Sequence, residues 1–209
     1  MAERTSAAVA AGYDVLAKWE SPSFDATTRA VLARRLDAPP ARRFFTAGQF
    51  AVLEAACARL LATPPGEPPI ASAIDADLFE GRREGFRRPD MPPADAAWRI
   101  ALDGIDAEAQ RRHANGFAAL DGASQDALLR AWQQGALGAE SFPGVPAQRF
   151  FGDVLLKTVA AQFYSRPDAW SEIGFGGPAS PRGYVRIGLD RRDPWEAPAG
   201  APRRTRGWP

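Results

Sequence analysis

The strongest helix signal in the sequence is PAQRFFGDVLLKTVAAQFYS, residues 146–165. Pro146 stands where a proline favours the first turn of a helix. Seven residues that share the spacing of one helix face follow it: Phe150, Phe151, Val154, Leu155, Thr158, Val159 and Gln162. Because this face is wide, we predict a central helix that other parts of the chain cover on more than one side.

Shorter helical patterns surround this segment and predict the fold class. Thr46 and Gln49 have the spacing of a capping box, and Phe45 and Phe50 that of a hydrophobic staple, so a helix is expected to begin at Thr46. Further helices are expected over 24–36, 72–80 and 95–115, and from Asp121 or Ser124 to Gln134. No segment sustains the period-two alternation of a strand. We therefore predict an all-α fold, an irregular helical body of about five to seven helices with extended N- and C-terminal arms and few or no strands.

The same patterns predict which side chains are buried. The inward positions of the two clearest amphipathic stretches are Phe24, Val31, Leu32 and Leu36 in 24–36, and Trp98, Ala101, Leu102, Ile105 and Ala109 in 95–115. Cys57 lies on the apolar stripe of the helix that begins at Thr46. We interpret this cysteine as a small buried apolar residue rather than a nucleophile.

The length of 209 residues predicts one domain, which we divide into three parts. Residues 1–40 form an N-terminal arm with a short helix, residues 41–173 the helical body, and residues 174–209 a C-terminal arm. The C-terminal arm holds seven Gly and six Pro, which prevent long regular structure, yet it is rich in aromatic residues. Disordered linkers are normally poor in aromatic residues, so we expect this arm to lie on a surface, either its own body or another protein.

Composition argues against several classes of function. The 26 basic and 25 acidic residues nearly cancel, whereas a nucleic-acid-binding protein needs a basic surplus. No run of about 18 apolar residues occurs, so no membrane span is expected. The sequence has one His and one Cys, and it lacks the spacing of zinc sites, G-x-S-x-G, HExxH and the P-loop. We therefore predict no catalytic, cofactor-binding or metal-binding residues in this chain. His113, near a predicted helix C-terminus, is interpreted as a partner of the helix dipole.

Three weaker patterns have two interpretations each. Asp75, Asp77 and Glu80 could supply oxygen ligands to a divalent cation, but acidic residues early in a helix are ordinary partners of the helix dipole. The arginine-rich loop 81–93 is either an anion site or a solvated loop. Residues 174–179 match G-x-G-x-x-A formally, but no strand precedes them and Pro178 stands where a helix should begin, which argues against a dinucleotide site.

The sequence resembles the gluconate 2-dehydrogenase subunit 3 family over about residues 42–195. The weakly specific part comprises Phe44-Phe45-Thr46, Leu60-Leu61, Pro64-Pro65, Ile74-Asp75, Phe117-x-x-Leu120 and Gln125-x-x-Leu128-Leu129. The more specific part comprises Phe150-Phe151, Thr158, Tyr164-Ser165-x-Pro167-x-x-Trp170, Ile173-Gly174-Phe175-x-Gly177-Pro178 and Gly183-Tyr184.

This resemblance implies a non-catalytic small subunit of an FAD-dependent dehydrogenase for sugars, sugar acids or glycosides. The implied partner is a catalytic subunit of the glucose–methanol–choline (GMC) type that carries the FAD, in some complexes with a cytochrome c subunit. The small subunit is then expected to clasp and stabilise the flavoprotein and to support its flavin loading. Many members carry a twin-arginine export signal that this sequence lacks, so we expect a cytoplasmic protein, or a periplasmic one that is exported together with a partner.

Aromatic residues in the two arms are the predicted contacts with the partner, because aromatic side chains are common anchors in interfaces. The six residues are Tyr13, Trp19, Trp170, Phe175, Tyr184 and Trp195. Two other functions stay open. One is a stand-alone small-molecule enzyme or binder that uses His113 and nearby carboxylates in a pocket between helices, and the other is an assembly chaperone that releases the flavoprotein after flavin insertion.

Overall fold

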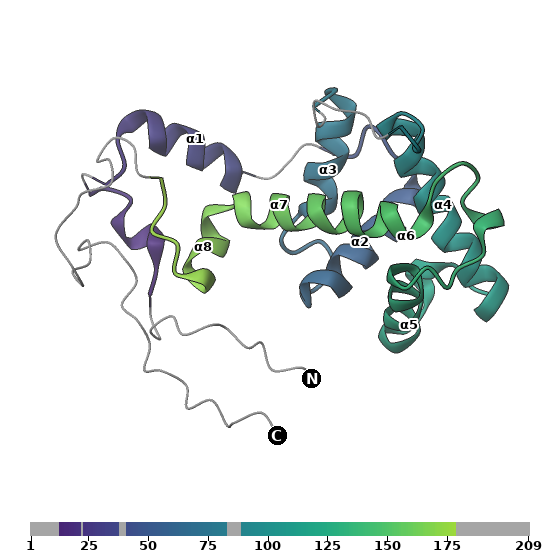
Figure 1. Cartoon of the computed structure of the whole chain (residues 1–209). Helices are drawn as coiled ribbons and strands as arrows, with labels where there is room; N and C mark the ends of the chain where they lie inside the picture. The colour runs from purple at the N-terminus through teal and green to yellow at the C-terminus, as the bar shows by residue number, and fades with distance from the viewer. Residues whose placement is uncertain (1–12, 22, 38–40, 83–88, 179–209) are drawn as a thin grey trace, which may run out of the picture. The chain divides into compact units, whose positions relative to one another are not determined.

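The computed structural model of the chain describes residues 13–21, 23–37, 41–82 and 89–178 (Figure 1). Every regular element in these residues is a helix, which confirms the predicted all-α class. The chain divides into two compact units, which we call unit 1 (residues 1–37 and 164–209) and unit 2 (residues 38–163). Residues 164–173, which we predicted as the last part of the helical body, lie in unit 1 with the N-terminal residues.

Within the described residues, unit 2 is a set of helices and helical turns. Its elements are α2 (Ala47–Leu61), α3 (Ile70–Phe79), α4 (Ala94–His113), the 3-10 turn η2 (Phe117–Ala119), α5 (Gly122–Gln133), the 3-10 turn η3 (Ala139–Ser141), α6 (Ala147–Phe150), the π-helix η4 (Phe151–Leu156) and α7 (Lys157–Ser165), whose last two residues belong to unit 1. Helix α4 contacts α2, α5 and α6 and is the central helix of unit 2.

The helical run predicted over 146–165 is present, with two differences from the prediction. Pro146 is the N-cap of α6 rather than its first helical residue, and the middle of the run is π-helical. Phe150, Phe151 and Leu155 are buried as predicted. The run is not the centre of unit 2, however, because α4 makes contacts with more elements.

Local sequence signals explain where several helices begin. The predicted capping box is confirmed at α2, where the Gln49 N–H donates to Thr46 Oγ1 and the Thr46 N–H donates to Gln49 Oε1, both over 3.2 Å. At α5 the Ser124 N–H donates to Asp121 Oδ1, so Asp121 is the cap and Ser124 is not. Each cap satisfies a backbone N–H that the first turn of a helix leaves unpaired.

The core of unit 2 is aromatic at its centre. The Trp98 ring lies edge-on to Phe150, with ring centroids 5.2 Å apart, and Trp132 stacks on Phe150 at 6.1 Å. The predicted inward residues of 95–115 are all buried, from Trp98 to Ala109. The Trp132 indole N–H donates to the Ala147 carbonyl over 2.8 Å, so the polar atom of this buried ring is paired.

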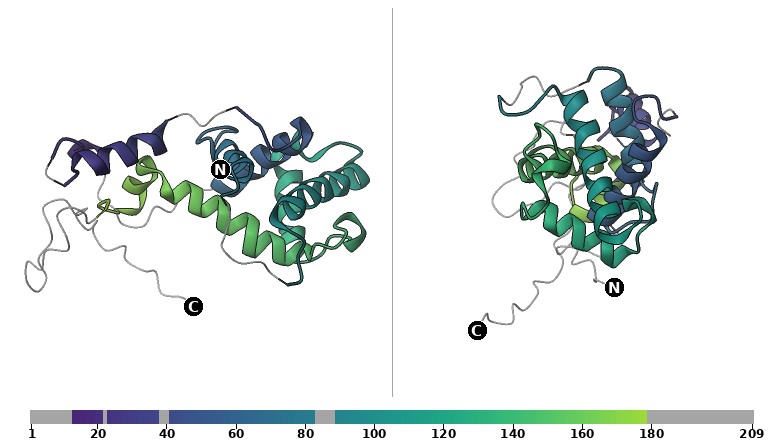
Figure 2. Two further views of the ribbon diagram at one scale, coloured as in Figure 1. Left: turned by 90° about the horizontal axis from the view of Figure 1, so that it is seen from above. Right: turned by 90° about the vertical axis from the view of Figure 1, so that its right-hand side faces the viewer.

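Unit 1 joins two segments from opposite ends of the sequence. The N-terminal segment contains η1 (Val15–Lys18) and α1 (Ala26–Leu36), and the C-terminal segment contains α8 (Pro167–Ile173). Helix α8 lies beside both η1 and α1 (Figures 1 and 2). In α1, Leu32 is buried as predicted, but the prediction for Val31 was wrong because this side chain is 43% exposed. Among the described residues, no helix combines the length and apolar character that crossing a membrane requires.

Candidate functional site

Unit 1 brings together the predicted partner contacts that fall within the described residues. Trp170 belongs to its core, and Tyr13 and Trp19 pack against that core while keeping part of their surface exposed. The Phe175 ring lies edge-on to Trp170, with ring centroids 5.1 Å apart. The two remaining predicted contacts, Tyr184 and Trp195, lie outside the described residues. The sequence pattern selected these aromatic residues but did not place them in one unit.

Trp170 is buried within unit 1. Its side chain is only 3% exposed and packs with Val15, Phe24 and Leu32 from the N-terminal segment. The indole N–H donates to the Tyr164 carbonyl over 2.7 Å. Because the chain's own residues cover this ring, Trp170 holds unit 1 together and leaves little surface for a partner.

Hydrogen bonds between residues far apart in sequence join the two segments of unit 1. The Val15 N–H donates to Ser171 Oγ over 3.1 Å, and the Lys18 ammonium donates to the Gly176 carbonyl. The Lys18 ammonium also lies over the Phe24 ring, 5.4 Å from its centroid. The N-terminal arm therefore has a defined partner within the chain, which is the α8 segment and the residues that follow it.

The glycines after α8 have structural roles that fit this packing. Gly174 ends α8 with a φ of 68°, a left-handed conformation that glycine adopts without strain. Gly177 has a φ of 81°, and a Cβ there would lie 2.9 Å from Cε1 of the buried Phe24 ring. The described part of this glycine-rich segment follows a helix, α8, and not a strand.

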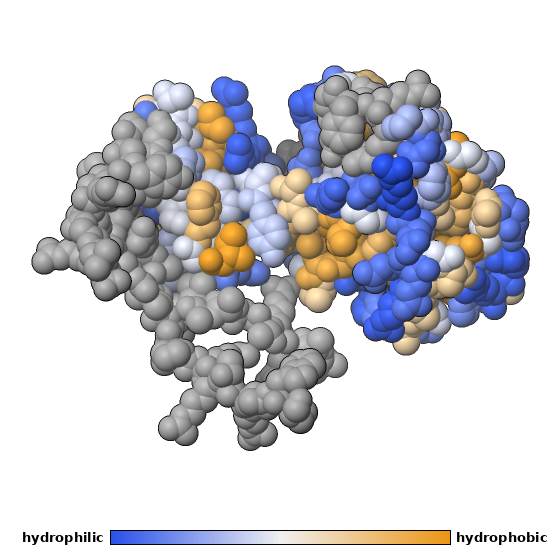
Figure 3. All heavy atoms as spheres, in the orientation of Figure 1, coloured by the Kyte–Doolittle hydropathy of each residue, from blue (hydrophilic) through white to orange (hydrophobic). Residues whose placement is uncertain are grey.

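Several apolar side chains remain on the surface of unit 1. Phe175 is 44% exposed and Ile173 is 50% exposed, and Val31 and Tyr164 are exposed to a similar degree. Figure 3 shows apolar and hydrophilic side chains interspersed on the visible face of the described residues. The sequence analysis selected Phe175 but missed Ile173, because isoleucine at the end of a short helix gives no aromatic signal.

In unit 2, Asp75 joins two parts of the family pattern. Its carboxylate is 1% exposed and accepts hydrogen bonds from three consecutive backbone N–H groups, those of Arg43 (2.6 Å), Phe44 (3.1 Å) and Phe45 (2.9 Å). The aspartate in α3 thus fixes the segment that leads into α2. These hydrogen bonds bring the Ile74-Asp75 and Phe44-Phe45 parts of the pattern together.

Arginine side chains stack on two phenylalanine rings close to this anchor. The Arg99 guanidinium lies 4.3 Å from the Phe44 ring centroid, and one of its N–H groups donates to the Phe44 carbonyl over 2.7 Å. The Arg43 guanidinium lies 4.3 Å from the ring centroid of Phe79, which is 51% exposed. Such cation–π contacts add stability beyond the area they bury.

The acidic residues of α3 are occupied by protein donors. Asp77 pairs with Arg82 and accepts from the Gln162 side chain over 2.6 Å, and Glu80 pairs with Arg43 over 2.9 Å. Asp75, in turn, is bound by backbone N–H groups. In the part of the chain that the structure describes, no group of three or more His, Cys, Asp or Glu residues is arranged to hold a metal ion.

Glu108 is a second buried carboxylate with a structural set of partners. It is fully buried in α4 and accepts hydrogen bonds from Arg111, Arg112 and the Ser141 hydroxyl, the last over 2.8 Å. Burial opposes ionisation of this carboxyl, but the hydrogen bonds from Arg111 and Ser141 and the charge of the two arginines outweigh burial and lower its pKa. Glu108 therefore ties the loop before α6 to α4.

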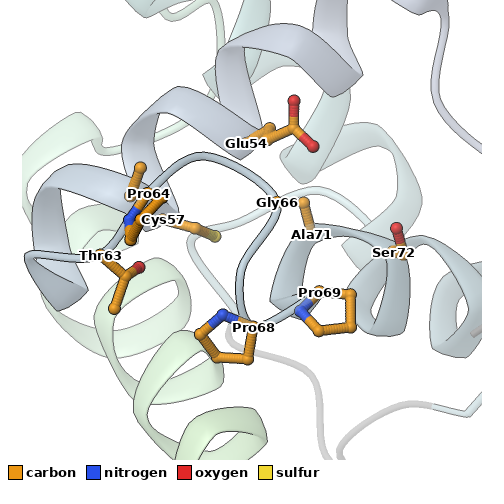
Figure 4. A pocket seen from close by; sticks show the side chains of 10 residues that line it. Glu54, Cys57, Thr63, Pro64, Gly66, Pro68, Pro69, Ala71 and Ser72 are labelled. Atoms are coloured by element: carbon orange, nitrogen blue, oxygen red, sulfur yellow. The ribbon is translucent and has the colours of Figure 1, made fainter. Parts of the chain in front are cut away.

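A small pocket lies between α2, the proline-rich loop that follows it and the start of α3 (Figure 4). Cys57 and Glu54 line it from α2. Burial, together with the nearby Glu54 carboxylate, raises the pKa of the Cys57 thiol to about 12, so the thiol stays protonated. Cys57 is 5% exposed, which confirms its interpretation as a buried apolar residue.

His113 lies in the last turn of α4, as predicted, and its side chain is exposed. It does not line the pocket that contains Cys57. A stand-alone enzyme of the kind considered above would need His113 and carboxylates in one pocket between helices. This pocket does not contain His113.

The chain is similar to a known protein family. A family model described as "Gluconate 2-dehydrogenase subunit 3" matches residues 47–177, which is more than half of the chain. The match begins at the first residue of α2 and ends at Gly177, so it includes the α8 segment of unit 1. Comparison with curated proteins and with solved structures gives no match.

Proposed function

Because the chain belongs to the gluconate 2-dehydrogenase subunit 3 family, we propose that it is a non-catalytic accessory subunit of an FAD-dependent sugar or glycoside oxidoreductase. It clasps and stabilises a GMC-type catalytic subunit and supports the flavin loading of that subunit. The FAD is held by the partner, and a cytochrome c subunit is the candidate third component. The observation that carries this proposal is unit 1, which gathers Tyr13, Trp19 and Phe175 around one core.

Residue chemistry supports unit 1 as the contact surface. Phe175 keeps 44% of its surface exposed although Trp170 holds its ring from one side. An aromatic ring that is already fixed loses little conformational entropy when a partner covers it. Ile173 adds exposed apolar surface that a partner would bury. The Trp19 ring is held edge-on by the Phe24 ring, with ring centroids 6.1 Å apart. Trp170 contributes indirectly, because it positions Phe175.

The test is co-expression of the flavoprotein with this chain. Without the chain, the flavoprotein should be poorly soluble or poor in flavin, because the surface that unit 1 covers is then exposed. Flavoprotein that is soluble and fully loaded with flavin when made alone would contradict the assembly role. Co-elution of the two proteins at a fixed ratio in gel filtration distinguishes a stable subunit from a chaperone that releases its product.

A matched pair of variants tests the surface itself. Phe175→Ala should weaken binding to the flavoprotein by at least about tenfold, which corresponds to about 1.4 kcal/mol. Phe79→Ala is the control, because Phe79 is an equally exposed aromatic residue in unit 2. Circular dichroism checks that both variants fold. If Phe79→Ala weakens binding as much as Phe175→Ala does, unit 1 is not the principal contact.

A further inference from the structure

Unit 1 has a core of its own, separate from that of unit 2. Among the described residues, its buried apolar cluster comprises Val15, Phe24, Leu32 and Trp170. The cluster in unit 2 contains twenty-six residues and shares none with it. Within the described residues, only these few buried side chains offset the entropy lost on ordering the two segments against each other.

Neither segment of unit 1 can form this core alone. The N-terminal segment contributes Val15, Phe24 and Leu32, and the C-terminal segment contributes Trp170. If the C-terminal segment leaves, the three N-terminal side chains lose the ring on which they pack. If the N-terminal segment leaves, Trp170 is uncovered. Each segment is therefore stable only while the other is present, which is the condition for cooperative opening.

Two of the polar contacts between the segments of unit 1 lie at the surface. The Arg35 guanidinium donates to the Ser165 carbonyl over 3.1 Å and the Arg166 guanidinium donates to the Arg35 carbonyl over 3.3 Å, and both bonds are exposed to solvent. Water can replace such bonds at little cost. The Ser23 hydroxyl is buried and has no hydrogen-bond partner among the described residues, which makes the closed state less favourable.

We propose that unit 1 is a latch, which opens and closes reversibly as one cooperative unit while unit 2 stays folded. Opening separates the N-terminal segment from α8, and closing rebuilds the surface that carries Phe175. If the proposed function holds, the flavoprotein binds the closed state of the latch and shifts the equilibrium toward it. This part of the proposal rests on the proposed function.

Hydrogen exchange on the full chain tests the latch. Backbone amides of α1 and α8 should exchange through one common opening, although the two helices are far apart in sequence, and amides of α4 should exchange much more slowly. Leu32→Ala should accelerate exchange in both α1 and α8 by the same factor, about thirtyfold or more, or bring both to the rate of an unfolded chain. Exchange in α4 should not change.

A control variant and a second perturbation make the outcome decisive. Leu53→Ala, at a fully buried position in unit 2, should accelerate exchange in α4. Gly177→Ala perturbs unit 1 from the C-terminal side, because its Cβ would meet the Phe24 ring, and it should accelerate α1 as well as α8. Acceleration of α4 by Leu32→Ala, or of α1 without α8, would overturn the proposal.

Addition of the flavoprotein separates the latch from the proposed function. If both hold, the flavoprotein slows exchange in α1 and α8 together. Coupled opening in the free chain with no slowing by the flavoprotein would keep the latch and contradict the proposed contact surface. Slowing of α8 without coupled opening in the free chain would keep the contact surface and contradict the latch.

Discussion

Removal of the Asp75 carboxylate should destabilise unit 2 strongly, and its three hydrogen bonds set the magnitude. The Phe45 N–H is buried, so leaving it unpaired costs about 1–3 kcal/mol. The N–H groups of Arg43 and Phe44 are partly buried and water can reach them, so together they add about 1–2 kcal/mol. Loss of a buried carboxylate recovers part of this cost. We therefore expect Asp75→Ala to lower the free energy of unfolding by about 3 kcal/mol.

Asp75→Asn separates hydrogen bonding from side-chain volume. The amide retains one oxygen acceptor but turns a nitrogen donor toward the backbone N–H groups, so we expect a loss of about 2 kcal/mol. The control is Asp77→Asn, two residues away in α3, where the carboxylate pairs with Arg82 at the surface. That variant should lose less than about 1 kcal/mol.

The measurement is urea unfolding followed by far-ultraviolet circular dichroism, with the slope of the transition compared among variants. An equal slope shows that the change is one of stability and not of the unfolded state. If Asp75→Asn unfolds within about 0.5 kcal/mol of the wild type, the three backbone hydrogen bonds do not hold the segment before α2, and the reasoning fails.

Three further predictions concern the interior of unit 2. Gly104→Ala should lower the free energy of unfolding by about 2 kcal/mol, because its Cβ would lie 2.7 Å from the Phe142 ring, whereas Gly48→Ala, with nothing within 4 Å, should be neutral or stabilising in the same urea experiment. Glu108→Gln should make the free energy of unfolding less dependent on pH below 4.5, the ordinary pKa of glutamate. A carboxylate whose pKa is lowered on folding stabilises the folded state above its ordinary pKa, and this stabilisation is lost as pH falls through the pKa of the folded state. A wild type and variant with parallel pH profiles would contradict this. Cys57 should react with iodoacetamide only as fast as the chain unfolds, since burial raises its pKa to about 12, and rapid labelling of the native chain would show that the thiol is accessible.

The parts of the fold that sequence predicted depend on residues close together in the chain. The capping box at Thr46 joins residues three apart, and the buried stripe from Trp98 to Ala109 repeats within one helix. These signals require no knowledge of what packs against the helix. Val31 shows the limit of such local signals. The apolar residues of α1 predict a wide buried face, but Leu32 is buried and Val31 is exposed, and how much of α1 is covered depends on its contact with α8.

The candidate site depended on contacts that no local pattern contains. We predicted both Trp170 and Phe175 as partner contacts, because the glycines and prolines near them in the sequence supply no apolar side chains that could bury their rings. Phe24 covers one of them, and it lies almost 150 residues earlier in the sequence. The role of Asp75 could not be predicted for the same reason, because its donors at residues 43–45 lie in the segment before α2, 30 to 32 residues earlier in the sequence.

The origin of unit 1 in both ends of the sequence has a consequence for synthesis on the ribosome. Residues 1–37 emerge first, and the 126 residues of 38–163 must be made before α8 exists. At about 5–20 residues per second this interval lasts about 6 to 25 s. During it, Val15, Phe24 and Leu32 have no Trp170 to pack against. For this interval the N-terminal segment of unit 1 is exposed to chaperones and proteases without the segment that covers it in the folded chain.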